Sequence, residues 1–116
     1  MNYKEMSDFE INLAAAKARY HQVEFIAEKE WVAVMGSGYR FDPCSNPLDA
    51  WPIILDNGIS INKWDKSDSF WTADVERPKA CDEYNTIEVK HENPLRAAMI
   101  CFLLMKDAEN DNRSTE

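Results

Sequence analysis

The chain has 116 residues, with 13 Lys and Arg against 21 Asp and Glu, which gives a formal net charge of −8. At this length one domain is expected, and roughly two-thirds of the unfolded surface can be buried without metal or disulfide support. Hydrophobic residues make up 45% and charged residues 29% of the chain, which excludes wholesale disorder. Because proteins bind nucleic-acid phosphates through a basic surface, the acidic balance argues against direct nucleic-acid binding.

The cysteines and the apolar runs indicate the compartment. Cys44, Cys81 and Cys101 are odd in number and form no CxxC pair, which is typical of a reducing cytoplasm. The first residues lack the apolar stretch of a secretory signal. The longest apolar run, 97–105, has nine residues, whereas a membrane span needs about 18. We therefore expect a cytoplasmic protein that does not contact a membrane.

The first predicted element is a helix over residues 8–19. Ser7 and Glu10 have the spacing of a capping box, in which each side chain bonds a free backbone N–H at the start of the helix. Met6 and Ile11 are placed for a hydrophobic staple across the same turn. Apolar residues then recur at helical spacing, so the pattern predicts one helix that packs one face on the core.

Two β-rich runs follow, 23–26 and 31–35, and they predict a hairpin with a connection of four residues. Gly36-Ser37-Gly38 ends the second run. A third glycine and a Gly-Lys-Ser/Thr motif are both missing, so this GxG is weak evidence for a phosphate-binding turn. We interpret it as an ordinary turn.

A second helix is predicted over residues 47–56. Asn46 is a favourable N-cap, Pro47 suits the first helical position, and Gly58 supplies a C-terminal stop. Pro52 lies inside this segment, where it removes one hydrogen bond and clashes with the preceding turn. We therefore expect a kinked or broken helix, with two short turns as one form.

Three further strands are predicted in the second half of the chain. Residues 59–63 and 69–73 read as two strands of a hairpin with a polar connection. Residues 76–85 contain a proline and several charges, so they predict an exposed loop. Thr86–Lys90 then alternates as a fifth strand with an apolar face.

The last predicted helix begins with Asn93-Pro94 and extends through Met105. Because it is apolar on nearly every side, it needs a sheet on one side and another helix or a partner subunit on the other. The sequence therefore leaves open whether the chain forms a homodimer. The pattern as a whole predicts an α+β fold, an α/β/α sandwich with a mostly antiparallel sheet of four to five strands and three helices. Residues 1–109 would form one compact domain, and 110–116 a loose C-terminal tail.

No pattern in the sequence selects a catalytic or metal site. His21 and His91 lie 70 residues apart, and no cysteine stands at ligand spacing to either of them. Ser37 lies in a segment that is close to G-x-S-x-G without matching it. Among 21 acidic residues, spacing alone cannot identify a catalytic pair. We assign no catalytic residue, no metal and no cofactor, and we expect a protein that is not an enzyme.

The thirteen aromatic residues are more informative. Most are expected in the core, but exposed Trp and Tyr side chains are frequent hot spots of protein interfaces. We expect a partner or ligand to contact the proline-rich segment 39–54 and the neighbouring tryptophans. The candidate contact residues are Tyr39, Arg40, Phe41, Trp51, Trp64 and Trp71.

Several short motifs in a fixed order resemble a small family of phage and prophage proteins. They are Ser7–Asn12, Tyr39–Pro43, Asp49–Ile54, Ile59–Ile61, Trp71–Ala73 and Asn93–Met99. Taken together the chain is similar to the NinX-like proteins of lambdoid phages, and more distantly to the phage ABA sandwich domains. The resemblance implies a compact α/β/α arrangement, a phage or prophage origin and the bacterial cytoplasm as the site of action. It implies no activity and brings no catalytic residues.

Two functions are compatible with these observations. The first is a non-enzymatic accessory protein that binds a host or phage protein, for which a host defence protein is one candidate. The second is an oligomeric protein that binds or sequesters a nucleotide-like small molecule. In that case Tyr39 and Phe41 would stack on the ligand and Arg40 would contact a phosphate. Thermal-shift screening against nucleotides separates the two hypotheses, because ligand binding raises the melting temperature.

Overall fold

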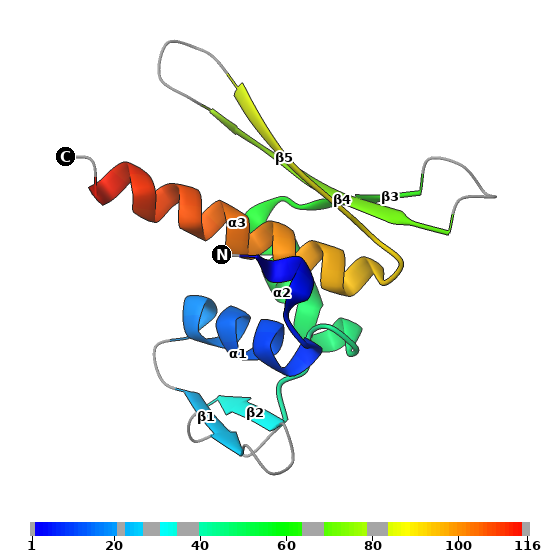
Figure 1. The fold of residues 1–116 in the computed structure, drawn as a ribbon, viewed down its shortest axis with the longest axis vertical. Coiled ribbons are helices and arrows are strands. Elements are labelled where there is room, and N and C mark those ends of the chain that lie inside the picture. The colour runs from blue at the N-terminus through cyan, green and yellow to red at the C-terminus, as the bar shows by residue number, and fades with distance from the viewer. Residues whose placement is uncertain are drawn as a thin grey trace.

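The computed structural model describes residues 2–20, 23–26, 31–34, 40–63, 69–78 and 84–114. Within these ranges the chain has a mixed α+β fold, as predicted (Figure 1). In chain order the elements are η1 (Tyr3–Glu5), α1 (Asp8–Arg19), β1 (Val23–Ile26), β2 (Trp31–Val34), α2 (Pro47–Asn57), β3 (Ser60–Asn62), β4 (Trp71–Pro78), β5 (Tyr84–His91) and α3 (Pro94–Ser114).

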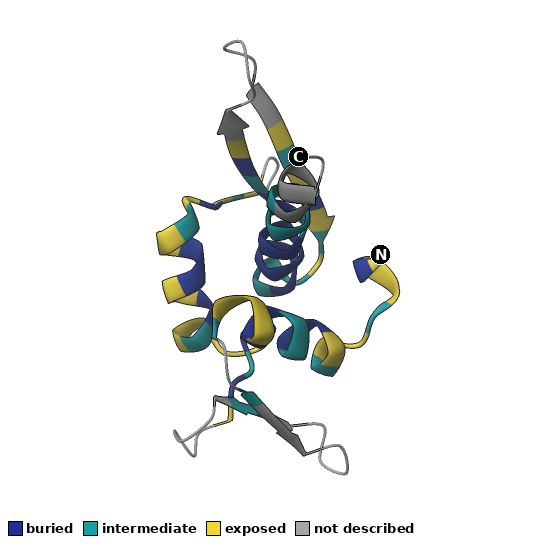
Figure 2. Ribbon diagram, turned by 90° about the vertical axis from the view of Figure 1, so that its left-hand side faces the viewer, coloured by how far each residue is buried: buried dark blue, intermediate teal, exposed yellow. Residues whose placement is uncertain are grey.

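Helix α3 is the centre of the structure. It contacts β4 and β5 on one side and α1 and α2 on the other (Figure 1). Buried residues occupy its central turns, as Figure 2 shows, and Phe102 is the largest of the fully buried side chains. The apolar surface of α3 is therefore covered within a single chain, by a sheet and by two other helices. Among the described residues, no helix is long and apolar enough to cross a bilayer.

The strands form two antiparallel sheets in the described chain, and not the single sheet of four to five strands that was predicted. β1 pairs with β2 in a two-stranded sheet beside α1, and the second sheet has the order β3-β4-β5. The two predicted hairpins are confirmed, because β1 pairs with β2 and β3 pairs with β4. The single sheet is wrong, because the pattern of a hairpin does not show which other strands it joins.

The larger sheet has one apolar and one polar face. Its register aligns Ile61 with Ala73 and Ala73 with Val89, and the latter two are buried toward α3. The alternating residues of the other face are polar: Ser60, Asn62, Thr72, Asp74, Glu76, Thr86, Glu88 and Lys90. A second helical layer would find no apolar surface there. The observed layers are thus sheet, then α3, then α1 with α2, which differs from the expected α/β/α sandwich.

The helix starts are confirmed, because they depend on local hydrogen bonds. Ser7 and Glu10 form the full capping box of α1. At α2, the Leu48 backbone N–H donates to the Asn46 side chain at 3.1 Å. At α3, the Leu95 N–H donates to Asn93 Oδ1 at 3.0 Å. The strands β1 and β2 also match the predicted runs, although Met35 and the Gly36–Gly38 turn lie outside the described residues.

Pro52 does not interrupt α2, which is one continuous helix over Pro47–Asn57. Of the two forms predicted for this segment, the broken helix with two short turns is therefore wrong, and the kinked helix stays a prediction. Pro52 removes the bond that would end on the Leu48 carbonyl, and both residues lie on the exposed side of α2. Water can reach that carbonyl, and solvent-side helix bonds are the weakest in the ladder. The other face of α2, which packs on α3, keeps its hydrogen bonds.

Two segments predicted as irregular contain regular structure. Residues 76–78 and 84–85 extend β4 and β5, where Glu76 pairs with Thr86 and Pro78 with Tyr84, so the predicted loop 76–85 is too long. A proline at the last position of a strand is tolerated because the ladder ends there. Helix α3 continues to Ser114, into the segment predicted as a loose tail. The Lys106–Glu109 ion pair, at 3.4 Å, supports this end of the helix.

The two cysteines in the described chain are free and fully buried. Burial raises the pKa of the Cys44 thiol to about 12, with smaller increases from Asp8 and Asp42 that Arg96 opposes. Burial also raises the pKa of the Cys101 thiol to about 12, and Asp74 adds to this. Since only the thiolate is nucleophilic, both side chains are inert in the folded protein.

We expect Cys44 and Cys101 to resist alkylation by iodoacetamide at pH 8 in the native protein and to react fully in denaturant. A pKa of about 12 in place of 9.0 lowers the thiolate fraction about a thousandfold. Peptide mapping by mass spectrometry measures the modification at each position. Rapid labelling of either residue under native conditions would contradict this burial.

Candidate interaction surface

Helix α2 has apolar residues on both of its long sides. Ala50, Ile53 and Ile54 are buried, and α2 contacts α3. On the opposite side Leu48, Trp51 and Leu55 are 81%, 56% and 59% exposed. Because these three positions are spaced i, i+3 and i+7, they form one stripe along the helix.

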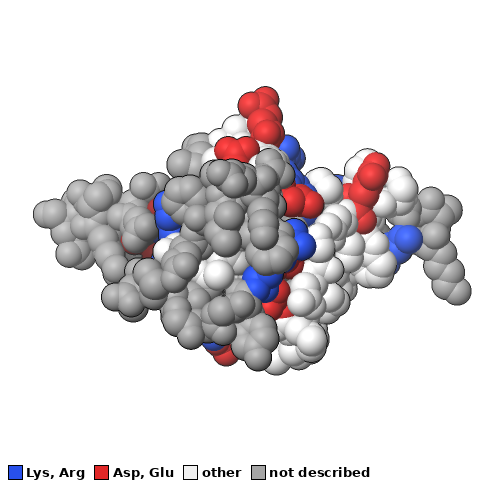
Figure 3. Space-filling model, turned by 90° about the horizontal axis from the view of Figure 1, so that it is seen from below, with Lys and Arg blue, Asp and Glu red and all other residues white. Residues whose placement is uncertain are grey.

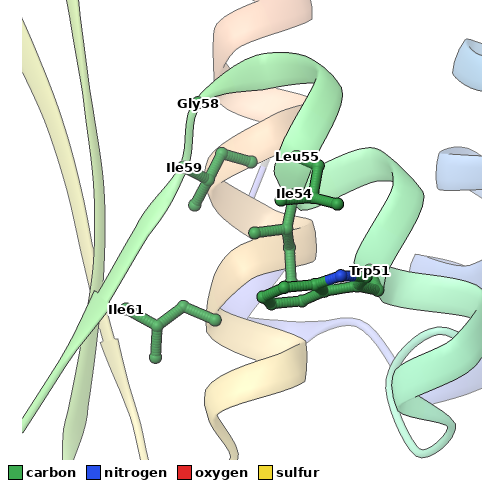
Figure 4. Close-up of a pocket in the computed structure, with 6 residues that line it drawn as sticks. All are labelled: Trp51, Ile54, Leu55, Gly58, Ile59 and Ile61. Atoms are coloured by element: carbon green, nitrogen blue, oxygen red, sulfur yellow. The ribbon is translucent and has the colours of Figure 1, made fainter.

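A groove of about 270 Å³ runs between this helix and the chain that enters β3. It is lined by Trp51, Ile54, Leu55, Gly58, Ile59 and Ile61. Figure 4 shows the Trp51 indole reaching across the groove toward Ile61, and the side chains of Ile59 and Ile61 pointing back toward α2. The stripe and the groove share Trp51 and Leu55. We call Leu48, Trp51, Leu55 and Ile61 together the α2–β3 surface, which lies over the buried Ile59.

The turn at Gly58 builds this groove. Gly58 has a φ of 65°, and its N–H donates to the carbonyls of Ile54 and Leu55. The Ile59 N–H then donates to the Ile54 carbonyl at 3.1 Å. These bonds end α2 in the left-handed conformation that glycine tolerates best. The chain reverses at once, which turns the side chains of Ile59 and Ile61 back toward α2 (Figure 4).

The charges of α2 lie beside the stripe. The helix contains Asp49 and Asp56 and no Lys or Arg. Asp56 forms an ion pair with Arg19 at 2.5 Å, and Asp49 accepts the Asp42 backbone N–H at 2.9 Å. On the face seen in Figure 3, Lys and Arg side chains lie among Asp and Glu side chains, next to an area without charges. From the helical spacing, Leu48, Trp51 and Leu55 form an uncharged stripe with the two carboxylates on one flank.

A buried amide network fixes the start of α2. Asn12, which is 5% exposed, donates from Nδ2 to Asp42 Oδ1 at 2.7 Å and accepts the Cys44 N–H at 3.1 Å. Asn93 donates to the Cys44 carbonyl at 2.7 Å. These bonds join α1, the segment before α2 and the start of α3. The α2–β3 surface is thus built on a rigid support.

Arg96 fixes the N-terminal segment in a similar way. Its side chain is buried, and it donates to Asp8 Oδ1 at 2.6 Å and to the carbonyls of Tyr3 and Met6 at 3.3 and 2.5 Å. The Tyr3 hydroxyl donates to Asp107 at 2.6 Å, and the pKa of Tyr3 is raised by burial and by this carboxylate. Residues 3–8 are therefore held against α3.

The structure places the contact residues predicted from the sequence in different environments. Trp51 is exposed and lines the groove. Trp71 is half-buried, with the Lys63 ammonium 5.3 Å from its ring centre. Phe41 is buried in the core, edge-on to the Tyr20 ring. Tyr39 and Trp64 lie outside the described residues.

The nucleotide hypothesis finds no support in this arrangement. Phe41 cannot stack on a ligand while its ring is packed in the core. Arg40 is exposed, and its guanidinium lies 3.5 Å from the Asp42 carboxylate, which would compete with a phosphate. Of the residues assigned to that ligand, the described ones do not form a stacking site.

Sequence reasoning missed Leu48, Leu55 and Asn12, which define or support this surface, and Arg96, which holds the N-terminal segment against α3. Neither leucine was singled out, because an apolar residue in an apolar helix carries no signal of its own. The sequence does contain a pattern that could have identified Asn12 and Arg96. Asn12 shares a helix face with the buried Ala15 and Ala16, and Arg96 is the single charged residue at the start of an apolar helix. A polar residue on an apolar face predicts a buried network when it has partners.

The chain matches a known protein family. The family described as bacteriophage P22 NinX matches residues 2–106 of the chain. The match includes α1, α2, the described strands and the buried turns of α3, and it confirms the resemblance found in the sequence. No curated protein matches the chain.

Proposed function

We propose that this chain, which belongs to the bacteriophage P22 NinX family, is a phage accessory protein that binds another protein and catalyses no reaction. Its binding site is the α2–β3 surface, and its partner is a protein of the host or of the phage in the cytoplasm of the infected bacterium. A host defence protein is one class of partner that fits this role.

The observation that carries the proposal is the exposed stripe of Leu48, Trp51 and Leu55. Exposed apolar patches on soluble domains mark interaction sites when they are contiguous and rimmed by polar groups. Tryptophan beside a pocket is also the residue type most enriched among interface hot spots. Here the three side chains adjoin an apolar groove and a rigid support, which keeps the free and bound conformations similar.

Purified wild-type chain, immobilised and exposed to a lysate of phage-infected bacteria, tests the proposal. We expect at least one protein to be retained by the wild-type chain and by a Lys17→Ser variant, but not by Trp51→Ser or Leu48→Ser. Lys17 is exposed on α1, so it is a matched surface control. With the retained protein purified, either stripe variant should weaken binding at least about 30-fold.

The four proteins should have the same circular dichroism spectrum and melting temperature, since the substituted side chains are exposed. Retention of the same set of proteins by the stripe variants and the wild-type chain would overturn the proposal.

A further inference from the structure

We infer that the partner presents a short amphipathic helix to the α2–β3 surface, with basic residues along one of its flanks. This inference rests on the proposed function and adds the chemistry of the partner. Four properties of the surface lead to it: its length, its shape, its area and its charge.

The length of the surface fits a helix of about three turns. Leu48 and Leu55 are seven residues apart, which is about 10 Å along the helix axis, and the whole of α2 spans about 16 Å. A partner helix lying along α2 can therefore contact the stripe with apolar residues at i, i+3 or i+4, and i+7. Longer partners would extend beyond the apolar strip.

The shape of the surface favours a helix over an added strand. A ridge of side chains lies beside an apolar groove, and helices pack by placing the ridge of one element into the groove of another. An extended segment would instead have to pair with the edge of β3, which contains only three residues, Ser60–Asn62. So short an edge offers few ladder hydrogen bonds.

The exposed area is too small for a stable pair of identical chains. From their exposed fractions, Leu48, Trp51 and Leu55 offer roughly 400 Å² of side-chain surface. A specific dimer of standard size buries about 800 Å² on each partner. Each copy also carries a net charge of −8, so two copies repel one another. A single helix of another protein matches the available area better.

The negative charge beside the stripe favours a partner helix that has basic residues next to its apolar contact residues. Asp49 and Asp56 lie seven residues apart on one flank of the stripe, and α2 has no Lys or Arg to compensate them. Arg19 reaches only Asp56. Lys or Arg along the facing flank of the partner would complement Asp49, since Asp56 already pairs with Arg19, and would increase the rate of association at low salt.

Selection from a displayed library of random 16-residue peptides tests this inference. The library is panned on the purified full chain and counter-selected on the Trp51→Ser variant. We expect the enriched peptides to carry apolar residues at helical spacing and a positive net charge. Synthetic copies should gain helical circular dichroism on binding. Their affinity should fall at least tenfold with Leu48→Ser and about threefold with Asp49→Asn, which keeps an acceptor for the Asp42 N–H.

Three outcomes would overturn the inference: no enrichment above the counter-selected background, enriched peptides that are acidic or lack helical spacing, or self-association of the chain that Leu48→Ser abolishes. A protein retained from lysate in a stripe-dependent way, together with failed peptide selection, overturns this inference alone. Failure of both experiments overturns the proposed function as well.

Discussion

Replacing Arg96 with Met should lower the free energy of unfolding by about 2–4 kcal/mol and the Tm by on the order of 10 °C. Methionine keeps much of the packed stem but removes every donor. The carbonyls of Tyr3 and Met6 then lose a charged partner inside the protein, and Asp8 loses its ion pair. Denaturant unfolding followed by circular dichroism measures the change.

Arg19→Met is the matched control for this experiment. Arg19 also forms an ion pair with an aspartate, Asp56, at 2.5 Å, but both side chains are substantially exposed. Exposed ion pairs contribute little, so we expect a loss of less than about 1 kcal/mol. Equal losses for Arg96→Met and Arg19→Met would show that the buried contacts of Arg96 do not stabilise the N-terminal segment.

Replacing Asn12 with Leu should cost a similar amount, about 2–4 kcal/mol. Leucine has nearly the same size, but it leaves the buried Cys44 N–H without its acceptor and Asp42 without its amide donor. The segment that leads into α2 loses its connection to α1. Thermal and denaturant unfolding give the magnitude, and Asn62→Ala, on an exposed strand residue, should change stability by less than about 0.5 kcal/mol.

Asn12→Asp distinguishes lost hydrogen bonds from lost packing. It keeps an oxygen for the Cys44 N–H but places a second carboxylate against Asp42 Oδ1, where Asn12 now donates at 2.7 Å. Repulsion raises the pKa of one carboxyl of the pair in the folded state. The unfolded state releases that proton at a lower pH than the folded state does. The destabilisation is therefore small below the unfolded pKa of about 4, grows as the pH rises, and is full only above the raised pKa of the folded state. A loss independent of pH would contradict the network.

The starts of the helices and the end of α2 could be predicted from the sequence, because they are determined by neighbouring residues. The end of α3 could not, since this helix continues past Met105 to Ser114. The Ser7–Glu10 capping box, the Asn46-Pro47 start and the Gly58 stop each act within one turn of chain. Their signals are therefore complete within a few residues. At Pro52 the local pattern gives a wrong prediction of a broken helix. It cannot show that the Leu48 carbonyl, which loses its hydrogen bond, faces water.

The pairing within each predicted hairpin could be predicted, because its two strands are neighbours in the sequence. The division of the strands into two sheets could not, because it depends on contacts between distant segments. Nothing within β1 or β2 distinguishes a separate hairpin beside α1 from two strands of a larger sheet. The polar face of β4 and β5 does carry such a signal. Alternating residues such as Asp74, Glu76 and Glu88 predict a face without a helical cover, once the register is known.

The candidate surface was only partly predictable for the same reason. Trp51 was predicted as a contact residue from its type, and the structure exposes it beside the groove. Leu48 and Leu55 are apolar residues in an apolar helix, and only the position of α3 decides which side of α2 is buried. Phe41 is the opposite case: it was predicted as a contact residue, but its ring packs in the core.

The α2–β3 surface can be tested directly in infected cells by photo-crosslinking. A photoreactive phenylalanine analogue is placed at Leu48 or Leu55, and at Lys17 on α1 and Lys90 on β5 as exposed control positions. After irradiation, we expect the same covalent adduct with one other protein from both α2 positions and from neither control position. Adducts only from Lys17 or Lys90, or none from Leu48 and Leu55, would contradict a partner bound at this surface.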